Sequence, residues 1–309
     1  MSQYDLIIIG AGPAGLTAAM YGRRAGLSVL VLEQTVAGGQ MRLTGDIENW
    51  PGLSVTTGDE LSEAMRAQSE SFGAEFREAM VSGLVPASEA SGPDHAVKVL
   101  GPDLTAPAII VASGAYHRSL DCPGAKDFHG RGVSFCAICD GGFFRNQEVA
   151  VVGGGNTALE QAMYLTNHAS RVHLVHRRDG YRADRLVQDR LAKNPKIETH
   201  LGYEVVAIEG KDEVERLRLR HAMSGREKSL EVPGVFLFVG SAPYSDFLPE
   251  AIRKAPGGWV ITDRSLQTSV GGIFAAGDVR DTDLRQIVTA AGDGALAAMN
   301  AYHYLEKRK

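Results

Sequence analysis

The chain opens with a short apolar run, a glycine-rich turn and an amphipathic helical pattern. Residues 6–9 are only Leu and Ile, which is typical of a parallel strand buried on both faces. Residues 13–26 predict a helix that stops at Gly26, and a second strand is expected over residues 28–32. This order of strand, turn, helix and strand predicts an α/β fold built on parallel sheets.

The same order of elements returns 143 residues later. A strand is expected over residues 148–152, a helix over about 156–168 and a further strand over 171–175. In this second unit Gly153 takes the place of Gly10. Such an internal duplication predicts two related nucleotide-binding units.

The glycines of the first unit have the spacing of a dinucleotide-binding turn. The first and third allow a tight turn and close helix packing, and the second admits a pyrophosphate. Glu33 ends the second strand, where an acidic side chain binds the hydroxyls of an adenosine ribose. The residues predicted to bind this dinucleotide are Gly10, Gly12, Pro13, Ala14, Gly15 and Glu33.

The second unit differs from the first at the position of Glu33. His176 stands there, and Arg177, Arg178 and Arg182 follow it. Arginines accommodate the 2′-phosphate of NADPH, whereas an acid favours an unmodified ribose. The sequence therefore predicts an NADPH site, with a solvated basic loop as the alternative interpretation. The predicted residues are Gly153, Gly155, Asn156, Thr157, Ala158, His176, Arg177, Arg178 and Arg182.

Two cysteines, Cys136 and Cys139, lie between the two glycine-rich turns and are followed by Asp140. A zinc site would need further Cys or His ligands that this segment lacks, so no metal site is predicted. A structural disulfide is not favoured in a chain with 3 cysteines that opens directly into a strand. We expect a redox-active pair, with Asp140 either exchanging protons or serving as a turn residue.

A relay from NADPH to a disulfide needs a carrier that converts hydride into paired electrons, so we expect FAD in the first unit. Segments 38–49 and 273–287 carry glycines and polar side chains that suit a flavin. Asp278 is expected either to accept a hydrogen bond from a ribityl hydroxyl or to be a turn residue. The helix expected over about 287–304 would stabilise negative charge at its N-terminus. The further predicted FAD residues are Gly39, Gln40, Thr44, Asn49, Gly277, Asp278, Arg285, Gln286 and Ile287.

Charge and hydropathy narrow the classes of partner. A formal net charge of −5 argues against general binding to nucleic acid or to a membrane surface. No apolar run approaches the roughly 18 residues of a membrane span. Because no basic segment or cleavage site precedes the first strand, a cytoplasmic protein is expected.

Taken together, the motifs resemble the low-molecular-weight thioredoxin reductases nearly end to end. The resemblance rests on Gly10–Gly15, Gly38–Gln40, Glu48–Gly52, Cys136–Asp140, Gly153–Ala158, His176–Ala183, Gly277–Asp281 and Arg285–Gln286. It implies a homodimer that reduces thioredoxin or a thioredoxin-like protein. It also implies that Cys139 is the sulfur nearer the flavin, that Cys136 attacks the partner and that Asp140 is the acid/base. This chain departs from the family's usual motif residues at Asn156-Thr157, Gly142 and Ile287. None of these departures removes a reacting group.

The resemblance and the chain order together predict two three-layer, Rossmann-like domains. The FAD domain would comprise residues 1–116 and 247–309, and the NADPH domain, residues 117–246, would be inserted between them and carry the cysteines. Rotation of the inserted domain is expected, because one arrangement can hardly serve both hydride transfer and access to a protein partner. The alternatives are a reductase of the same fold using NADH or a ferredoxin-type donor, and a non-enzymatic FAD redox sensor.

Overall fold

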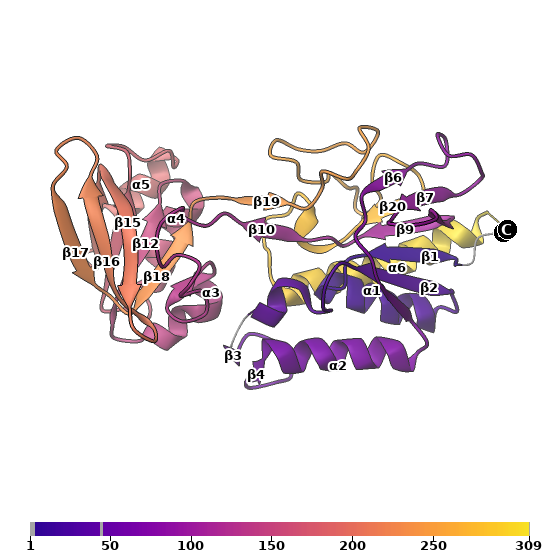
Figure 1. The fold of residues 1–309 in the computed structure, drawn as a ribbon, viewed down its shortest axis with the longest axis horizontal. Coiled ribbons are helices and arrows are strands. Elements are labelled where there is room, and N and C mark those ends of the chain that lie inside the picture. The colour runs from indigo at the N-terminus through magenta and orange to yellow at the C-terminus, as the bar shows by residue number, and fades with distance from the viewer. Residues whose placement is uncertain (1–3, 44–45, 309) are drawn as a thin grey trace. The chain divides into compact units, whose positions relative to one another are not determined.

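The computed structural model describes residues 4–43 and 46–308 (Figure 1). The chain divides into two compact units, which we call the split unit (residues 1–116 and 242–309) and the inserted unit (residues 117–241). The two segments that cross between them, β10 (Ala115–His117) and β19 (Ser241–Pro243), pair in a two-stranded sheet. Which nucleotide each unit binds stays a prediction.

The split unit is built on a five-stranded parallel sheet in the order β20, β9, β1, β2, β5. All four residues of β1 and of β9 are buried, as expected for central strands covered on both faces. The strands are β1 (Leu6–Ile9), β2 (Val29–Glu33), β5 (Glu75–Glu78), β9 (Ala108–Val111) and β20 (Ile273–Ala275).

The parallel sheet of the split unit lies between two layers (Figure 1). Leu6 and Ile8 pack with the helices α1 (Pro13–Arg24) and α6 (Ile287–Glu306), whereas Ile7 and Ile9 pack towards an antiparallel three-stranded sheet. The unit therefore has three layers. Its other elements are α2 (Gly58–Ser71), the outer strands β6 (Gly83–Val85), β7 (His95–Lys98) and β8 (Leu104–Ala106), and the short pieces η1 (Gly39–Leu43), β3 (Asp46–Ile47), β4 (Thr56–Thr57) and η3 (Gly277–Val279).

Small residues let α6 lie directly against α1. A Cβ added to Gly294 would come within 2.1 Å of the carbonyl oxygen of Ala14. A Cβ on Gly277, which follows β20 and begins η3, would come within 2.9 Å of the Ala14 side chain. The C-terminal segment is therefore fixed beside the glycine turn that opens the chain.

The inserted unit repeats this design. Its parallel sheet has the order β11, β18, β12, β13, β14; one face packs on the helices and the other on an antiparallel sheet. The elements are β11 (Val133–Ser134), α3 (Ala137–Asp140), η2 (Gly141–Phe144), β12 (Glu148–Gly153), α4 (Asn156–Leu165), β13 (Arg171–His176), α5 (Arg185–Leu191), β14 (Ile197–Leu201), β15 (Tyr203–Gly210), β16 (Val214–His221), β17 (Glu227–Glu231) and β18 (Gly234–Phe238).

The predicted fold class, two Rossmann-like units with parallel sheets, is confirmed, and the element positions agree within a few residues. The helix expected to reach residue 168 ends at Leu165, where the Thr166 hydroxyl donates to the carbonyl of Met163 at 2.6 Å. Among the described residues, no helix combines the length and apolar composition that crossing a bilayer needs.

Candidate active site

The first glycine turn joins β1 to α1, and its three glycines have different surroundings. A Cβ on Gly10 would lie 2.3 Å from the carbonyl oxygen of Ala112, and one on Gly15 would lie 1.9 Å from the carbonyl oxygen of Gly10. At Gly12 a Cβ would meet nothing within 4 Å. The first and third glycines therefore serve close packing, whereas the second faces open space that a pyrophosphate could approach.

The N-terminus of α1 is open toward the same space. Gly12 is its N-cap residue and Pro13 begins the helix, so no side chain caps the first turn. Uncapped backbone N–H groups and the helix dipole favour an anion at this position. The segment of Gly39 lies against this turn, because Gly38 donates its N–H to the carbonyl of Ala11 at 2.8 Å.

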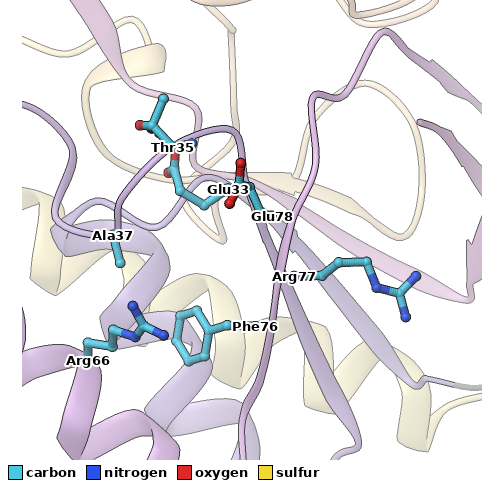
Figure 2. Close-up of a pocket in the computed structure, with 7 residues that line it drawn as sticks. All are labelled: Glu33, Thr35, Ala37, Arg66, Phe76, Arg77 and Glu78. Atoms are coloured by element: carbon cyan, nitrogen blue, oxygen red, sulfur yellow. Dashed lines mark hydrogen bonds between the residues drawn. The ribbon is translucent and has the colours of Figure 1, made fainter. Parts of the chain in front are cut away.

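Glu33 lies at the carboxyl end of β2, next to the first turn. Its Oε2 accepts the N–H of Ala11 at 2.8 Å, and its Oε1 accepts the N–H groups of Gln34 at 2.9 Å and Thr35 at 3.1 Å. These bonds fix the carboxylate at the rim of a pocket of about 140 Å³. Figure 2 shows the residues that line it: Glu33, Thr35, Ala37, Arg66, Phe76, Arg77 and Glu78.

The position and lining of this pocket suit the adenosine end of a dinucleotide. Phe76 offers a ring face, and the Arg66 guanidinium lies 5.4 Å from the centre of that ring. Except for Glu33, the lining residues were not predicted. Thr35 and Ala37 follow Glu33 in the chain, whereas the residues from α2 and β5 (Arg66, Phe76, Arg77 and Glu78) lie far from the glycine motif in sequence. Only the position of β5 beside β2 in the sheet brings them there.

Residues predicted for the flavin ring converge from three segments of the split unit. The Gln40 side chain donates a hydrogen bond to the carbonyl of Ala115. The Asn49 amide donates to the side-chain oxygen of Gln286 at 3.1 Å, which joins the segment after η1 to the start of α6. Gln286 also forms a capping box with Thr289, and Ile287 begins the helix. Thr44, another predicted flavin residue, lies outside the described residues.

Arg285 and Asp278 are half-buried charged residues of this site. Burial raises the pKa of Asp278 to about 6, with Arg285 opposing that rise and Asp293 adding to it. The Arg285 guanidinium stacks over Trp259 at 3.9 Å, and its Nε is buried without a hydrogen-bond partner among the described residues. A buried donor without a partner is costly, so this arrangement fits a bound group that would accept its hydrogen bond.

The second glycine turn, between β12 and α4, has the same arrangement. A Cβ on Gly153 would come within 2.6 Å of both Ala158 and the carbonyl of Phe238, whereas one at Gly155 would meet nothing within 4 Å. Ala158, in the third position, is fully buried, and no side chain caps the helix that begins at Asn156 and Thr157. This turn also presents an uncapped helix N-terminus to open space.

The basic segment after β13 is held against this second turn. Arg182 donates its N–H to the carbonyl of Gly154 at 2.8 Å. The Asn156 amide donates to Asp184 at 2.7 Å, and the Asp184 N–H donates back to Asn156 Oδ1 at 2.7 Å. Asp184 was not predicted; it closes a clamp that fixes the arginine segment beside the helix N-terminus.

His176 and the arginines lie in different surroundings. The His176 ring is buried beneath Gly154, where a Cβ would come within 2.3 Å of it, and burial lowers the His176 pKa, with the nearby arginines adding to that effect. Arg177, Arg178 and Arg182 are exposed, and none has an acidic partner within ion-pair distance among the described residues. Their charges are therefore available to a phosphate.

A disulfide joins Cys136 and Cys139 at the start of α3. Cys136 is the N-cap residue of this short helix, and its sulfur accepts the N–H of Cys139 at 3.2 Å. The helix packs on α4, where a Cβ on Gly141 would lie 2.9 Å from Leu165. Cys122 is a separate, half-buried thiol whose pKa is raised by burial and by Asp121.

Ser134 connects the disulfide to Asp140. Its hydroxyl donates to Asp140 Oδ2 at 2.6 Å and accepts the N–H of Cys136 at 3.0 Å. Burial raises the Asp140 pKa, although the Ser134 hydrogen bond and the charge of His129 oppose that rise. A carboxyl that keeps its proton to higher pH beside a disulfide can supply that proton to a departing thiolate. Ser134 carried no sequence signal of its own.

Comparisons with known proteins agree on one family. The model of the pyridine nucleotide-disulphide oxidoreductases matches residues 4–294. The chain is 44% identical over 308 residues to the thioredoxin reductase of Listeria innocua, covering 99% of this chain and 95% of that protein. It is 42% identical over 305 residues to that of Bacillus subtilis, covering 98% and 95%. The solved thioredoxin reductase of Streptococcus pyogenes matches with a TM-score of 0.93 and 43% identity, over 98% of both chains.

Proposed function

The chain belongs to the pyridine nucleotide-disulphide oxidoreductase family, and from this premise we propose how its residues perform the reaction of the thioredoxin reductases. Its activity is that of an NADPH-dependent flavoprotein that reduces a disulfide of thioredoxin. The observation that carries the proposal is the Cys136–Cys139 disulfide, which lies beside the half-buried carboxyl of Asp140 in the unit that also holds the second glycine turn.

The split unit has the features that FAD requires. Gly12 and the open N-terminus of α1 would bind the pyrophosphate, and Glu33 with its pocket would hold the adenosine. Gly39, Gln40 and Asn49 would lie along the ring system, with Gly277, Asp278, Arg285, Gln286 and Ile287 on the C-terminal side. The unpartnered Nε of Arg285 supports this assignment, because a bound flavin would satisfy it.

The inserted unit has the features that NADPH requires. Gly155 and the N-terminus of α4, with Asn156 and Thr157, would bind the pyrophosphate, while Arg177, Arg178 and Arg182 would hold the 2′-phosphate. His176 would support the turn from below, since its ring packs on Gly154. When bound, FAD and NADPH supply the two-electron transfer that protein side chains cannot perform.

The dithiol exchange can be written in terms of this chain's own atoms. With the pair reduced, the Cys136 thiolate attacks the partner's disulfide, which forms a mixed disulfide and releases one partner thiolate. The Cys139 thiolate then attacks Cys136, which re-forms the internal disulfide and releases the reduced partner. Asp140 would protonate the thiolate that leaves when the internal disulfide is opened.

The predicted FAD residues and NADPH residues belong to different units, so the two cofactors must be brought together for hydride transfer. Reacting atoms must come within about 3–3.5 Å, and the dithiol must also reach a protein partner. Rotation of the inserted unit on the segments β10 and β19 would allow both. An engineered cross-link that clamps the units should abolish turnover while leaving FAD bound; turnover at the uncrosslinked rate would contradict the rotation.

A homodimer and a cytoplasmic location also belong to this proposal, and both rest on similarity to the thioredoxin reductases. Light scattering coupled to gel filtration should give twice the 33.0 kDa mass of one chain. A mass equal to one chain would contradict the dimer. Fractionation of cells that produce the protein tests its location.

The function is tested by NADPH-dependent reduction of oxidised thioredoxin. Cys136→Ser should abolish this reduction, because the thiol that attacks the partner is missing. Cys122→Ala is the matched control, since Cys122 forms no disulfide, and it should keep wild-type turnover. Turnover of thioredoxin by Cys136→Ser would exclude the proposed exchange, and turnover supported by a ferredoxin-type donor but not by NADPH would favour the alternative donor class.

A further inference from the structure

A second group of polar side chains lies in the inserted unit, away from the second glycine turn. His173 on β13 pairs in register with Glu198 on β14, and His200 follows Glu198 on the same face of the sheet. His173 lies three residues before the end of its strand, whereas the glycine turn follows the carboxyl end of the sheet. Both imidazoles are buried, and nothing in the proposed electron relay uses them.

The ligand atoms of these three residues converge on one point. His173 Nδ1 lies 3.1 Å from His200 Nε2. Glu198 places one carboxylate oxygen 3.6 Å from His200 Nε2 and the other 3.8 Å from His173 Nδ1. Tetrahedral zinc with bonds of about 2.0–2.1 Å holds its ligand atoms about 3.3–3.4 Å apart, so the observed separations need little adjustment.

We propose that His173, His200 and Glu198 form a site for one divalent transition-metal ion of the zinc class, with water completing the coordination. Two imidazoles and one carboxylate form a donor set that zinc accepts in proteins. The same nitrogen and oxygen donors also suit Co²⁺, Ni²⁺ and Cu²⁺. The described residues contain one such group of three ligands.

The outer partner of His173 supports this assignment. Its second nitrogen, Nε2, lies 2.8 Å from Glu148 Oε2. When Nε2 donates its proton to that carboxylate, Nδ1 is left with a free lone pair directed at His200. A carboxylate behind a histidine is the usual support of a metal-binding imidazole, because it fixes the tautomer and raises the basicity of the ligating nitrogen.

The tautomer of the buried His200 ring is set by Lys228. Lys228 Nζ lies 2.6 Å from His200 Nδ1, and an ammonium can only donate. In the metal-free protein, therefore, His200 carries its proton on Nε2 and donates it to His173 Nδ1.

A metal ion would compete with this hydrogen-bonded arrangement. Binding at His200 Nε2 requires the proton to move to Nδ1, which then no longer accepts from Lys228. Lys228, whose Nζ lies 2.6 Å from His200 Nδ1, must then turn away from the imidazole. The Lys228 charge therefore opposes the metal, and removing it should tighten binding.

Glu198 is the solvent-exposed member of the three ligands. The His173 and His200 side chains are only 8% and 4% exposed, but that of Glu198 is 45% exposed. Arg171 donates to Glu198 Oε2 at 2.9 Å and holds the carboxylate over the two imidazoles. A bound ion would connect the neighbouring strands β13 and β14 and would stabilise the inserted unit through its binding equilibrium.

Calorimetric titration of the tag-free, FAD-loaded protein with Zn²⁺ tests the proposal. The Cys136–Cys139 disulfide is kept oxidised so that its thiols cannot bind metal. One Zn²⁺ should bind per chain, and Co²⁺ should give the intense visible bands of a tetrahedral site. His173→Gln with His200→Gln should weaken Zn²⁺ affinity more than tenfold, and Glu148→Gln should weaken it about 10–100-fold.

Two further variants keep the result interpretable. His303→Gln changes an exposed histidine on α6 and should leave Zn²⁺ affinity unchanged. Lys228→Met should tighten Zn²⁺ binding about tenfold or more by removing a nearby positive charge. The proposal is overturned if no Zn²⁺ binds at one per chain, if the double glutamine variant binds as tightly as wild type, or if Lys228→Met does not tighten binding.

Discussion

The hydroxyl of Ser134 donates a hydrogen bond of 2.6 Å to the carboxylate of Asp140. Because the same hydroxyl accepts the N–H of Cys136, one serine connects the proposed proton donor to the proposed attacking cysteine. The bond favours the charged form of Asp140, whereas burial favours the protonated form, and burial has the larger effect. Ser134 therefore tunes the pH range in which Asp140 can deliver a proton.

Removing this hydroxyl should change the pH dependence of disulfide reduction. In Ser134→Ala the bond that lowers the Asp140 pKa is gone, so the carboxyl keeps its proton to higher pH. If Asp140 acts as an acid, the alkaline fall in the rate of internal disulfide reduction should move to higher pH. Stopped-flow reduction of the disulfide across a pH series measures this. Ser134→Thr retains the hydroxyl and should restore the wild-type profile.

A second variant shows whether the effect acts through Asp140. Asp140→Asn should slow the step roughly 10²-fold or more, in the range expected for the loss of a general acid. Adding Ser134→Ala to Asp140→Asn should then leave the pH profile unchanged. A shift that persists without the carboxyl would mean that Ser134 acts only on the conformation of Cys136.

The arginine segment should determine the choice between NADPH and NADH. Arg177→Ala with Arg178→Ala removes two charges that have no acidic partner among the described residues. At about 1.5–3 kcal/mol for each charge-assisted hydrogen bond, the preference for NADPH should fall by roughly 10²–10⁴-fold. Steady-state KM values for both nucleotides measure this preference.

The matched control for this pair is Arg220→Ala. Arg220 lies on β16 near Glu204, at 3.5 Å, and outside the basic segment. Its removal should leave both KM values unchanged. An equal rise in the KM of NADPH and NADH in the double alanine variant would reject the 2′-phosphate assignment.

Asp278 should make the stability of the flavin-free protein depend on pH. Its pKa is raised from its usual 3.8 to about 6 in the folded state, so folding favours the protonated form. This contribution is fully present below about pH 4 and is lost as the pH rises through 6; its full size is roughly 3 kcal/mol at most. Asp278→Asn stays neutral and should be more stable than wild type at pH 8, but not at pH 4.

Urea unfolding followed by tryptophan fluorescence measures this difference, because both tryptophans, Trp50 and Trp259, belong to the split unit. The control Asp283→Asn changes an exposed carboxylate near Arg285 and should keep the wild-type dependence on pH. If Asp278→Asn and wild type lose stability in parallel between pH 4 and pH 8, Asp278 is not the group responsible.

The parts of this molecule that local sequence determines could be predicted. Apolar runs such as residues 6–9 form strands because a buried parallel strand has no polar face to place in water. The glycine turns could be predicted because their spacing marks positions that favour glycine. At Gly10 and Gly15 an added Cβ would clash with backbone atoms. The spacing of Cys136 and Cys139, with two residues between them and no further zinc ligands nearby, predicted a redox-active pair, and the structure joins them in a disulfide.

What could not be predicted depends on contacts between distant segments. The clamp between Asn156 and Asp184 forms only because the basic segment folds back on the second turn. The pocket beside Glu33 depends on β5 lying next to β2. The pair of His173 and His200 depends on the register of β13 and β14, which no local motif encodes.

The central claim is that electrons pass from NADPH through FAD to the Cys136–Cys139 disulfide and then to thioredoxin. Anaerobic titration of the purified flavoprotein, first with NADPH and then with oxidised thioredoxin, tests it most directly through the flavin absorbance. The account predicts bleaching by NADPH, weaker bleaching by NADH at the same concentration, and recovery on adding thioredoxin that is lost in Cys136→Ser. No bleaching by either nucleotide, or recovery with thioredoxin in Cys136→Ser, would contradict it.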